Sequence, residues 1–349
     1  MAKIVFAAGT SHSPALGSTI EDYLLHGCRD RERDWQLDIN GNRCTFDDLI
    51  NKTNRSFSNE IAPEIISKRI KNCKKAIEKI RKNIKAASLD ALIIIGDDQK
   101  EQYLSDNMPS ILIYGGEFLH NVPLRLGPEA PDYWRKARQQ FHELKQPYDY
   151  PVHSDLAKRL TTELINANFD ISYSCSMDQE IGEGHAFGFV HQRLIKDLDV
   201  PVVPVIINTY YPPNQPGPRR CYELGRSISA AIRKIDNIDR VGIIASGGLS
   251  HFTIDECLDR QIIEACKGNQ PEFWTRIPRN KLKSGNSEIR NWITVAGTVE
   301  HLANDWSVYE PCYRTEAGTG CGTAFAVWRQ ELRMNCFSKP IGWQFMTQT

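Results

Sequence analysis

Four short apolar runs, each followed at once by a polar or glycine-rich loop, constrain the fold of this chain most. They span residues 3–8, 91–96, 202–208 and 241–245. Runs of this length without polar alternation are typical of strands that are buried on both faces of a sheet. Segments with helical periodicity separate these runs, at residues 154–166 and 221–234. Ser154 is the expected N-cap of the first segment. This alternation predicts an α/β fold with a central, mostly buried sheet flanked by helices.

Residues 20–88 interrupt the alternation. Residues 20–60 are polar and irregular, whereas an apolar stripe at helical spacing follows, made of Ile66, Ile70, Cys73, Ile77, Ile80 and Ile84. The opposite face carries Lys68, Lys71, Lys74, Lys75, Lys79, Lys82 and Lys85. Such a run usually marks a solvated helix face, and phosphate binding is the minor alternative. We therefore predict one catalytic domain, residues 1–349, with a helical insertion at about 20–88.

Charge and cysteine usage exclude several classes of protein. The chain has 43 basic and 43 acidic side chains, whereas proteins that bind nucleic acids or membrane surfaces usually carry a basic excess. No apolar stretch could span a bilayer, and the run after Lys3 is too short for a signal-peptide core. The ten cysteines form no Cys-x-x-Cys pair, which argues against a clustered zinc site and a disulfide scaffold. We expect a cytoplasmic protein with reduced thiols.

Histidines and an acid stand where chemistry is expected in such a fold, because sites gather at the carboxyl ends of strands. His12 follows the first apolar run, His251 follows the last, His185 lies in a glycine-rich loop, and Glu288 begins a predicted helix that Asn286 or Ser287 would cap. Each residue alone fits a structural role. Together, two histidines and a carboxylate form the non-haem Fe(II) arrangement for oxygen chemistry, and a further histidine would supply acid–base catalysis.

Seven short motifs carry a family resemblance through their order. They are Gly9–Pro14, Gly96–Gln99, Gly184–Phe187, Asn208–Pro213, Arg220–Gly225, Ser246–His251 and Gly285–Trp292. In this order they resemble the class III extradiol ring-cleavage dioxygenases, the family of the protocatechuate 4,5-dioxygenase catalytic subunit. The resemblance covers the first 14 residues and most of 90–330, and it is most specific around His12 and in the Ser246–His251 block.

The resemblance implies a role for each site residue. His12 matches the family's first iron ligand, Glu288 its carboxylate ligand, His251 its acid–base histidine, and His185 a second pocket histidine that contacts the substrate. The chain departs from the family at the second ligand histidine, where Gln99 stands. An amide oxygen can ligate iron but is a weaker donor than imidazole. We take Gln99 as the third metal ligand, with Asp98 or water as the open alternatives.

The implied activity is that of a non-haem Fe(II)-dependent dioxygenase, which opens a catechol- or gallate-type ring with O2. The implied partners are a small aromatic diol and O2, and we expect a homo-oligomer. A ring carboxylate would need an arginine or a set of polar donors, for which Arg290, Arg314 and Arg220 are candidates. The insertion at 20–88 is a candidate cover for the active-site mouth, or a replacement for a small partner subunit.

Two alternatives keep the fold but change the function. The first is a metal-dependent hydrolase or lyase of an aromatic ring compound, which the presence of Gln99 favours. The second is a non-enzymatic binding protein that has lost its metal. The presence of His185 and His251 beside His12 and Glu288 argues against this second alternative.

Overall fold

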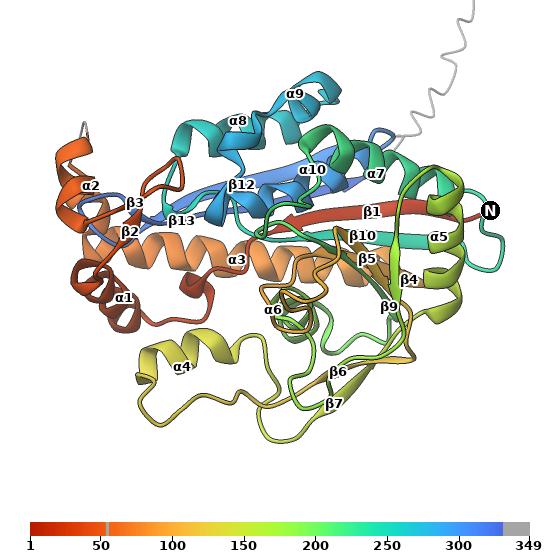
Figure 1. The fold of residues 1–349 in the computed structure, drawn as a ribbon, viewed down its shortest axis with the longest axis horizontal. Helices are drawn as coiled ribbons and strands as arrows, with labels where there is room; N and C mark the ends of the chain where they lie inside the picture. Colours follow the sequence, from red (N-terminus) through yellow and green to blue (C-terminus); the bar gives the residue numbers. More distant parts are fainter. Residues whose placement is uncertain (54–55, 331–349) are drawn as a thin grey trace, which may run out of the picture.

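A mixed sheet of nine strands forms the centre of the computed structural model, which describes residues 1–53 and 56–330 (Figure 1). Its strands run in the order β11–β13–β1–β10–β4–β9–β5–β8, and β12 also pairs with β13. Their bounds are β1 (Lys3–Thr10), β4 (Ala91–Gly96), β5 (Ile111–Tyr114), β8 (Ser172–Ser174), β9 (Val202–Ile207), β10 (Arg240–Ser246), β11 (His251–Thr253), β12 (Ala303–Tyr313) and β13 (Thr319–Arg329). The four predicted apolar runs are the adjacent parallel strands β1, β10, β4 and β9.

Helices cover both faces of the sheet, so the predicted α/β fold with a buried sheet is confirmed (Figure 1). One face packs against α5 (Ser154–Asn166), α7 (Pro218–Ile232), α8 (Glu256–Cys266), α9 (Pro271–Arg276) and α10 (Ile289–Thr298). The other packs against α1 (Ile20–Glu32), α3 (Pro63–Ala87) and α6 (His185–Val190). Alternate residues of β4 enter the two cores, with Ile93 on one side and Leu92 on the other.

The predicted long helix of the insertion is α3, and its apolar stripe is buried as expected. The lysines on its other face are exposed, in agreement with a solvated face. Before α3 come α1, the small hairpin β2 (Gln36–Leu37) with β3 (Arg43–Cys44), α2 (Phe46–Lys52) and the 3-10 turn Ser58–Ile61.

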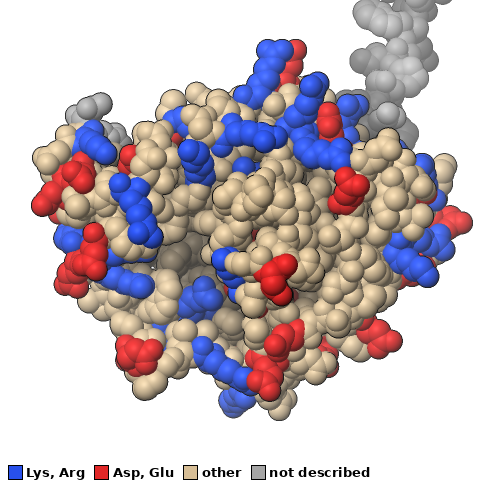
Figure 2. Space-filling model, viewed as in Figure 1, with Lys and Arg blue, Asp and Glu red and all other residues tan. Residues whose placement is uncertain are grey.

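Figure 2 shows a hollow between α3 and α4 (Asp132–Gln139) with basic side chains around it. The division into one domain with an insertion stays a prediction.

Two helix starts differ from the sequence-based expectation. His153, not Ser154, caps α5, since the His153 ring accepts the Leu156 amide at 3.3 Å while the Ser154 hydroxyl donates to the Gly116 carbonyl. Helix α7 begins at Pro218, because proline lacks the amide hydrogen that would be unpaired at a first helical position anyway.

The described cysteines are free thiols, as expected, and Cys336 lies outside the described residues. Within residues 1–53 and 56–330, none of the helices has the length and apolarity that a transmembrane span requires.

Candidate active site

The carboxyl ends of four parallel strands bring the predicted site together. His12 follows β1, Gln99 follows β4, Tyr210 follows β9, and His251 follows β10. Because these strands are parallel neighbours, their carboxyl ends meet at one edge of the sheet. All four side chains line one cavity of about 200 Å³.

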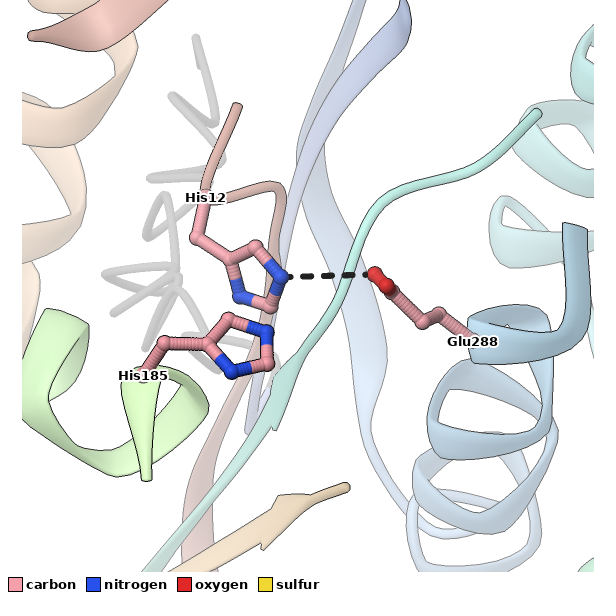
Figure 3. A group of neighbouring side chains, drawn as sticks. All are labelled: His12, His185 and Glu288. Atoms are coloured by element: carbon pink, nitrogen blue, oxygen red, sulfur yellow. Dashed lines mark ion pairs between the residues drawn. The ribbon is translucent and has the colours of Figure 1, made fainter. Parts of the chain in front are cut away.

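Two further site residues reach this cavity from helices. His185 is the first residue of α6, and Glu288 ends the 3-10 turn Ser284–Glu288 that leads into α10. No side chain caps α10, so the expected caps Asn286 and Ser287 do not act there. The His12 and His185 rings lie side by side and face Glu288 (Figure 3), with ring centroids 4.7 Å apart. One ligand atom from each of the three residues lies within 4.8 Å of the other two.

The Glu288 carboxylate is the centre of the cluster, and its side chain is only 1% exposed. Five groups surround its oxygens: the Gly248 amide at 2.6 Å, Gln99 Nε2 at 3.1 Å, His12 Nε2 at 3.3 Å, His251 Nε2 at 3.3 Å and the Tyr210 hydroxyl at 3.4 Å. Burial would raise the pKa of Glu288, but His251 and His12 hold it well below its usual range. This lowered pKa favours the ionised carboxylate, the form that a metal ligand requires.

Glu101, which no sequence motif marked as a site residue, fixes His185. Its carboxylate lies 2.9 Å from His185 Nδ1 and also accepts the His185 backbone amide at 3.1 Å. Burial alone would lower the pKa of His185, but Glu101 raises it to about 9. With Nδ1 on a carboxylate, Nε2 is the nitrogen that remains for a ligand, as in the metal-bound histidines of many proteins. The signal for Glu101 was its place two residues past Gln99 in the same loop.

The loop after β4 holds the residues that stand where the family has its second histidine. Gln99 donates through Nε2 to Glu288, so its amide nitrogen faces the carboxylate. The Asp98 carboxylate accepts the backbone amides of Glu101, Gln102 and Tyr103 at 2.9 to 3.3 Å. Asp98 could enter the site only by giving up these three bonds, which disfavours it as a ligand.

His251 is held with one ring nitrogen toward the site. Its Nδ1 lies 3.0 Å from the Leu249 carbonyl, which makes Nδ1 the protonated nitrogen and turns Nε2 toward Tyr210 and Glu288. The Tyr210 hydroxyl lies 3.0 Å from this Nε2. The His251 ring packs on Gly285, where a Cβ atom would lie 2.6 Å from the ring. Tyr210 was missed as a functional residue, although it lies within the Asn208–Pro213 motif.

The predicted substrate-binding arginines lie in different places. The structure does not bring Arg290 into the cavity: it is 3% exposed, and its guanidinium donates to the backbone carbonyls of Thr209, Pro216, Leu282 and Ser287. Arg290 therefore ties loops together. Arg220 lies on α7, where it stacks over the Phe169 ring, and it is also outside the cavity. Arg314 does line the cavity, where it forms an ion pair with Asp30 at 2.9 Å.

A cluster of two histidines and a carboxylate, with a third histidine beside it at the strand ends of an α/β sheet, is the donor set typical of a non-haem metal site. The model of the catalytic LigB subunit of aromatic ring-opening dioxygenases matches residues 60–301. The chain belongs to this family of class III extradiol dioxygenases. The match includes Gln99, His185, His251 and Glu288, whereas His12 precedes it.

Two curated relatives bear the name 2,3-dihydroxyphenylpropionate/2,3-dihydroxicinnamic acid 1,2-dioxygenase. The protein of Mycobacterium sp. (strain MCS) is 39% identical over 106 residues, which cover 30% of this chain and 31% of the relative. The protein of Xanthobacter autotrophicus is 25% identical over 193 residues, which cover 55% of this chain and 52% of the relative. The chain thus aligns with about a third and about half of the lengths of these relatives.

Proposed function

We propose that this protein opens the ring of a catechol- or gallate-type aromatic compound with O2, as a non-haem Fe(II)-dependent extradiol dioxygenase. The buried cluster of His12, His185 and Glu288 at the wall of the cavity carries the proposal. Family membership and the names of the two relatives support it.

The donor set fits a divalent iron ion. Burial lowers the pKa of His12, which favours the neutral imidazole that a metal requires, whereas His185, with a pKa raised to about 9, would release its Nε2 proton when a metal binds. His12 Nδ1 is held by Ser246 Oγ at 3.2 Å and His185 Nδ1 by Glu101, so both rings are oriented from behind. We assign His12, His185 and Glu288 as the residues that would hold the ion. Bound Fe(II) would supply Lewis acidity toward the diol and electron transfer between the ring and O2.

Gln99 is a second candidate for the third ligand, because its amide lies 3.1 Å from Glu288. Its carbonyl oxygen could ligate after a rotation of the amide, whereas the nitrogen now facing Glu288 cannot. We expect His185→Ala to lose most bound iron and Gln99→Ala to keep it, as measured by metal analysis after reconstitution. The opposite result would assign the third position to Gln99.

His251 is the residue that we assign to proton transfer. Its Nε2 faces the cavity with the tautomer fixed by the Leu249 carbonyl, so it can take a proton from a diol hydroxyl and return it later. The Tyr210 hydroxyl lies on the same nitrogen and can orient it or relay the proton. Phe141 and Phe252 supply apolar walls that exclude water.

Oxygen uptake by the Fe(II)-reconstituted protein tests the proposal directly. The panel would include catechols, gallate, protocatechuate and 2,3-dihydroxyphenylpropionate, with the absorbance of ring-opened product followed in parallel. Uptake of one O2 per diol supports a dioxygenase, and Glu288→Gln should abolish it by weakening iron binding. Turnover without O2 would support the hydrolase or lyase. Failure to bind iron would support a binding protein.

The homo-oligomer also stays a proposal. It is motivated by the insertion at 20–88, which could replace a separate small subunit. Size-exclusion chromatography with light scattering would test it, and a monomer at micromolar concentration would contradict it.

A further inference from the structure

Helix α4 and the turn after it form one wall of the cavity. Trp134, Ala137, Arg138 and Phe141 all line it, at the spacing that places residues on one helix face. The helix is tied to α1, since Lys136 forms an ion pair with Asp22 at 3.0 Å. Arg138 is therefore part of a fixed wall.

The Phe141 ring connects Arg138 to the proposed metal-binding cluster. The Arg138 guanidinium carbon lies 5.5 Å from the centroid of this ring. The same ring lies 6.1 Å from the His12 ring and 5.8 Å from the His185 ring, measured between centroids. Arg138 thus lies about one aromatic ring beyond the histidines, within reach of a substituent on a bound diol.

The charge of Arg138 is available to a ligand. The cavity contains two guanidinium groups, and that of Arg314 is already paired with Asp30 at 2.9 Å. Among residues 1–53 and 56–330, no carboxylate forms an ion pair with Arg138. Its guanidinium lies over the Phe141 ring, and its charge also helps to lower the pKa of Glu101, whose carboxylate is paired with His185. A guanidinium offers a planar fork of donors that matches a carboxylate, and partial burial strengthens the pairing.

We propose that Arg138 determines substrate specificity by binding an anionic side arm of the aromatic diol. The ring hydroxyls face His12, His185 and Glu288, the arm passes along Phe141, and its carboxylate pairs with Arg138. The inference rests on the proposed function and narrows its substrate class from diols in general to diols with an acidic side arm. It also replaces Arg290 as the carboxylate-binding residue, because the donors of Arg290 are engaged by backbone carbonyls.

Matched substrates separate this role from a structural one. Steady-state kinetics would compare 2,3-dihydroxyphenylpropionate with 3-propylcatechol, which has a similar arm without the charge. Arg138→Met should lower kcat/KM for the acid by about 10- to 100-fold, mainly through KM, and leave the neutral diol within about 3-fold. Arg138→Lys should recover part of the loss. The control Arg219→Met, on an arginine whose side chain is 81% exposed, should leave both substrates unchanged. An equal loss for both substrates in Arg138→Met would overturn the proposal.

A binding measurement distinguishes this inference from the proposed function. Calorimetry on the purified protein would compare 3-phenylpropionate, which has the arm but no diol, with 3-phenylpropanol. The wild type should prefer the acid, and Arg138→Met should weaken its binding by about 10- to 100-fold. If the wild type shows no preference, the Arg138 proposal is wrong even where ring opening is observed. If binding depends on Arg138 but no diol is opened, the proposed function fails and the Arg138 site stands.

Discussion

Replacing Glu101 with Gln tests the ion pair that holds His185 in the site. The two side chains are 20% and 7% exposed, and their charged atoms lie 2.9 Å apart. Against the effect of burial, the pair raises the pKa of His185 from 6.5 to about 9 and lowers that of Glu101 from 4.5 to about 2. Either pKa shift corresponds to an interaction free energy of about 3 kcal/mol. The two shifts report the same ion pair, so their energies are not added. We expect Glu101→Gln to lower the free energy of unfolding of the metal-free protein by about 3 kcal/mol.

The size of this loss should depend on pH in a defined direction. Because folding raises the pKa of His185, its stabilisation is complete below about pH 6.5 and is lost as the pH rises through about 9. Because folding lowers the pKa of Glu101, its stabilisation is complete above about pH 4.5 and is lost as the pH falls toward about 2. The difference between the wild type and the variant should therefore be largest near about pH 5.5 and fall below about 1 kcal/mol near pH 10.

Urea denaturation of chelator-treated protein at several pH values measures this difference. Glu180→Gln is the matched control, because the Glu180 side chain is 88% exposed and its ion pair with Arg125 spans 4.0 Å. The control should change the free energy of unfolding by less than about 0.5 kcal/mol at every pH. A loss in Glu101→Gln that stays constant from about pH 5.5 to 10 would refute the ion-pair reasoning and assign the effect to packing.

Four further substitutions test other parts of the molecule. His251→Phe should keep iron bound but reduce turnover by about 100- to 10,000-fold, as followed by oxygen uptake and metal analysis. Tyr210→Phe removes the hydroxyl on His251 Nε2, so kcat should fall by about 10-fold and the pH profile of kcat should move, while iron content stays unchanged. Arg290→Met removes one buried guanidinium that donates to four carbonyls and should destabilise the protein by about 3 kcal/mol in urea melts. Ile80→Ala opens a cavity under α3 and should cost about 2 to 5 kcal/mol in the same assay.

The inner sheet could be predicted from the sequence because its strands are buried on both faces. A strand covered by helices on both sides needs apolar residues at every position, and β4 and β9 show this without interruption. Among the described residues, the long strand β12 pairs only with β13, at the margin of the sheet, and most of its first eight residues are only partly buried. Its mixture of polar and apolar residues gives no comparable signal, so it could not be predicted by the same reasoning.

The site could be predicted where the motif residues themselves face the cavity. Five motif residues line the cavity: His12, Gln99, His185, His251 and Glu288. The order of the motifs and the rule that sites gather at strand ends are enough to indicate them. The supporting residues could not be found this way. Glu101 acts through His185, and Arg138 enters from α4, a helix that no motif marks.

The positive charge of an arginine does not by itself show what the side chain binds, as Arg290 illustrates. Arg290 was a candidate because a ring carboxylate would need an arginine or a set of polar donors. Its guanidinium instead donates to the carbonyls of Thr209 and Pro216, in the loop between β9 and α7, and of Leu282, and no residue pattern distinguishes that arrangement from a substrate site. The distinction depends on where the chain places unpaired carbonyls, which only the tertiary structure reveals.

Helix α1, within the predicted insertion at 20–88, supports two walls of the cavity from behind. Asp22 of α1 forms an ion pair with Lys136 of α4, the helix that carries Arg138. Asp30 of α1 forms an ion pair with Arg314, so both walls with a guanidinium are tied to α1. The Asp30 carboxylate also accepts the Thr319 hydroxyl at 2.7 Å, which fixes the start of β13 beside the cavity. Of the two arginines that line the cavity, Arg314 is thus paired with a carboxylate, and Arg138 has no ion pair with a carboxylate of the described residues. Helix α1 thus supports the site by shaping both the position and the charge of its walls.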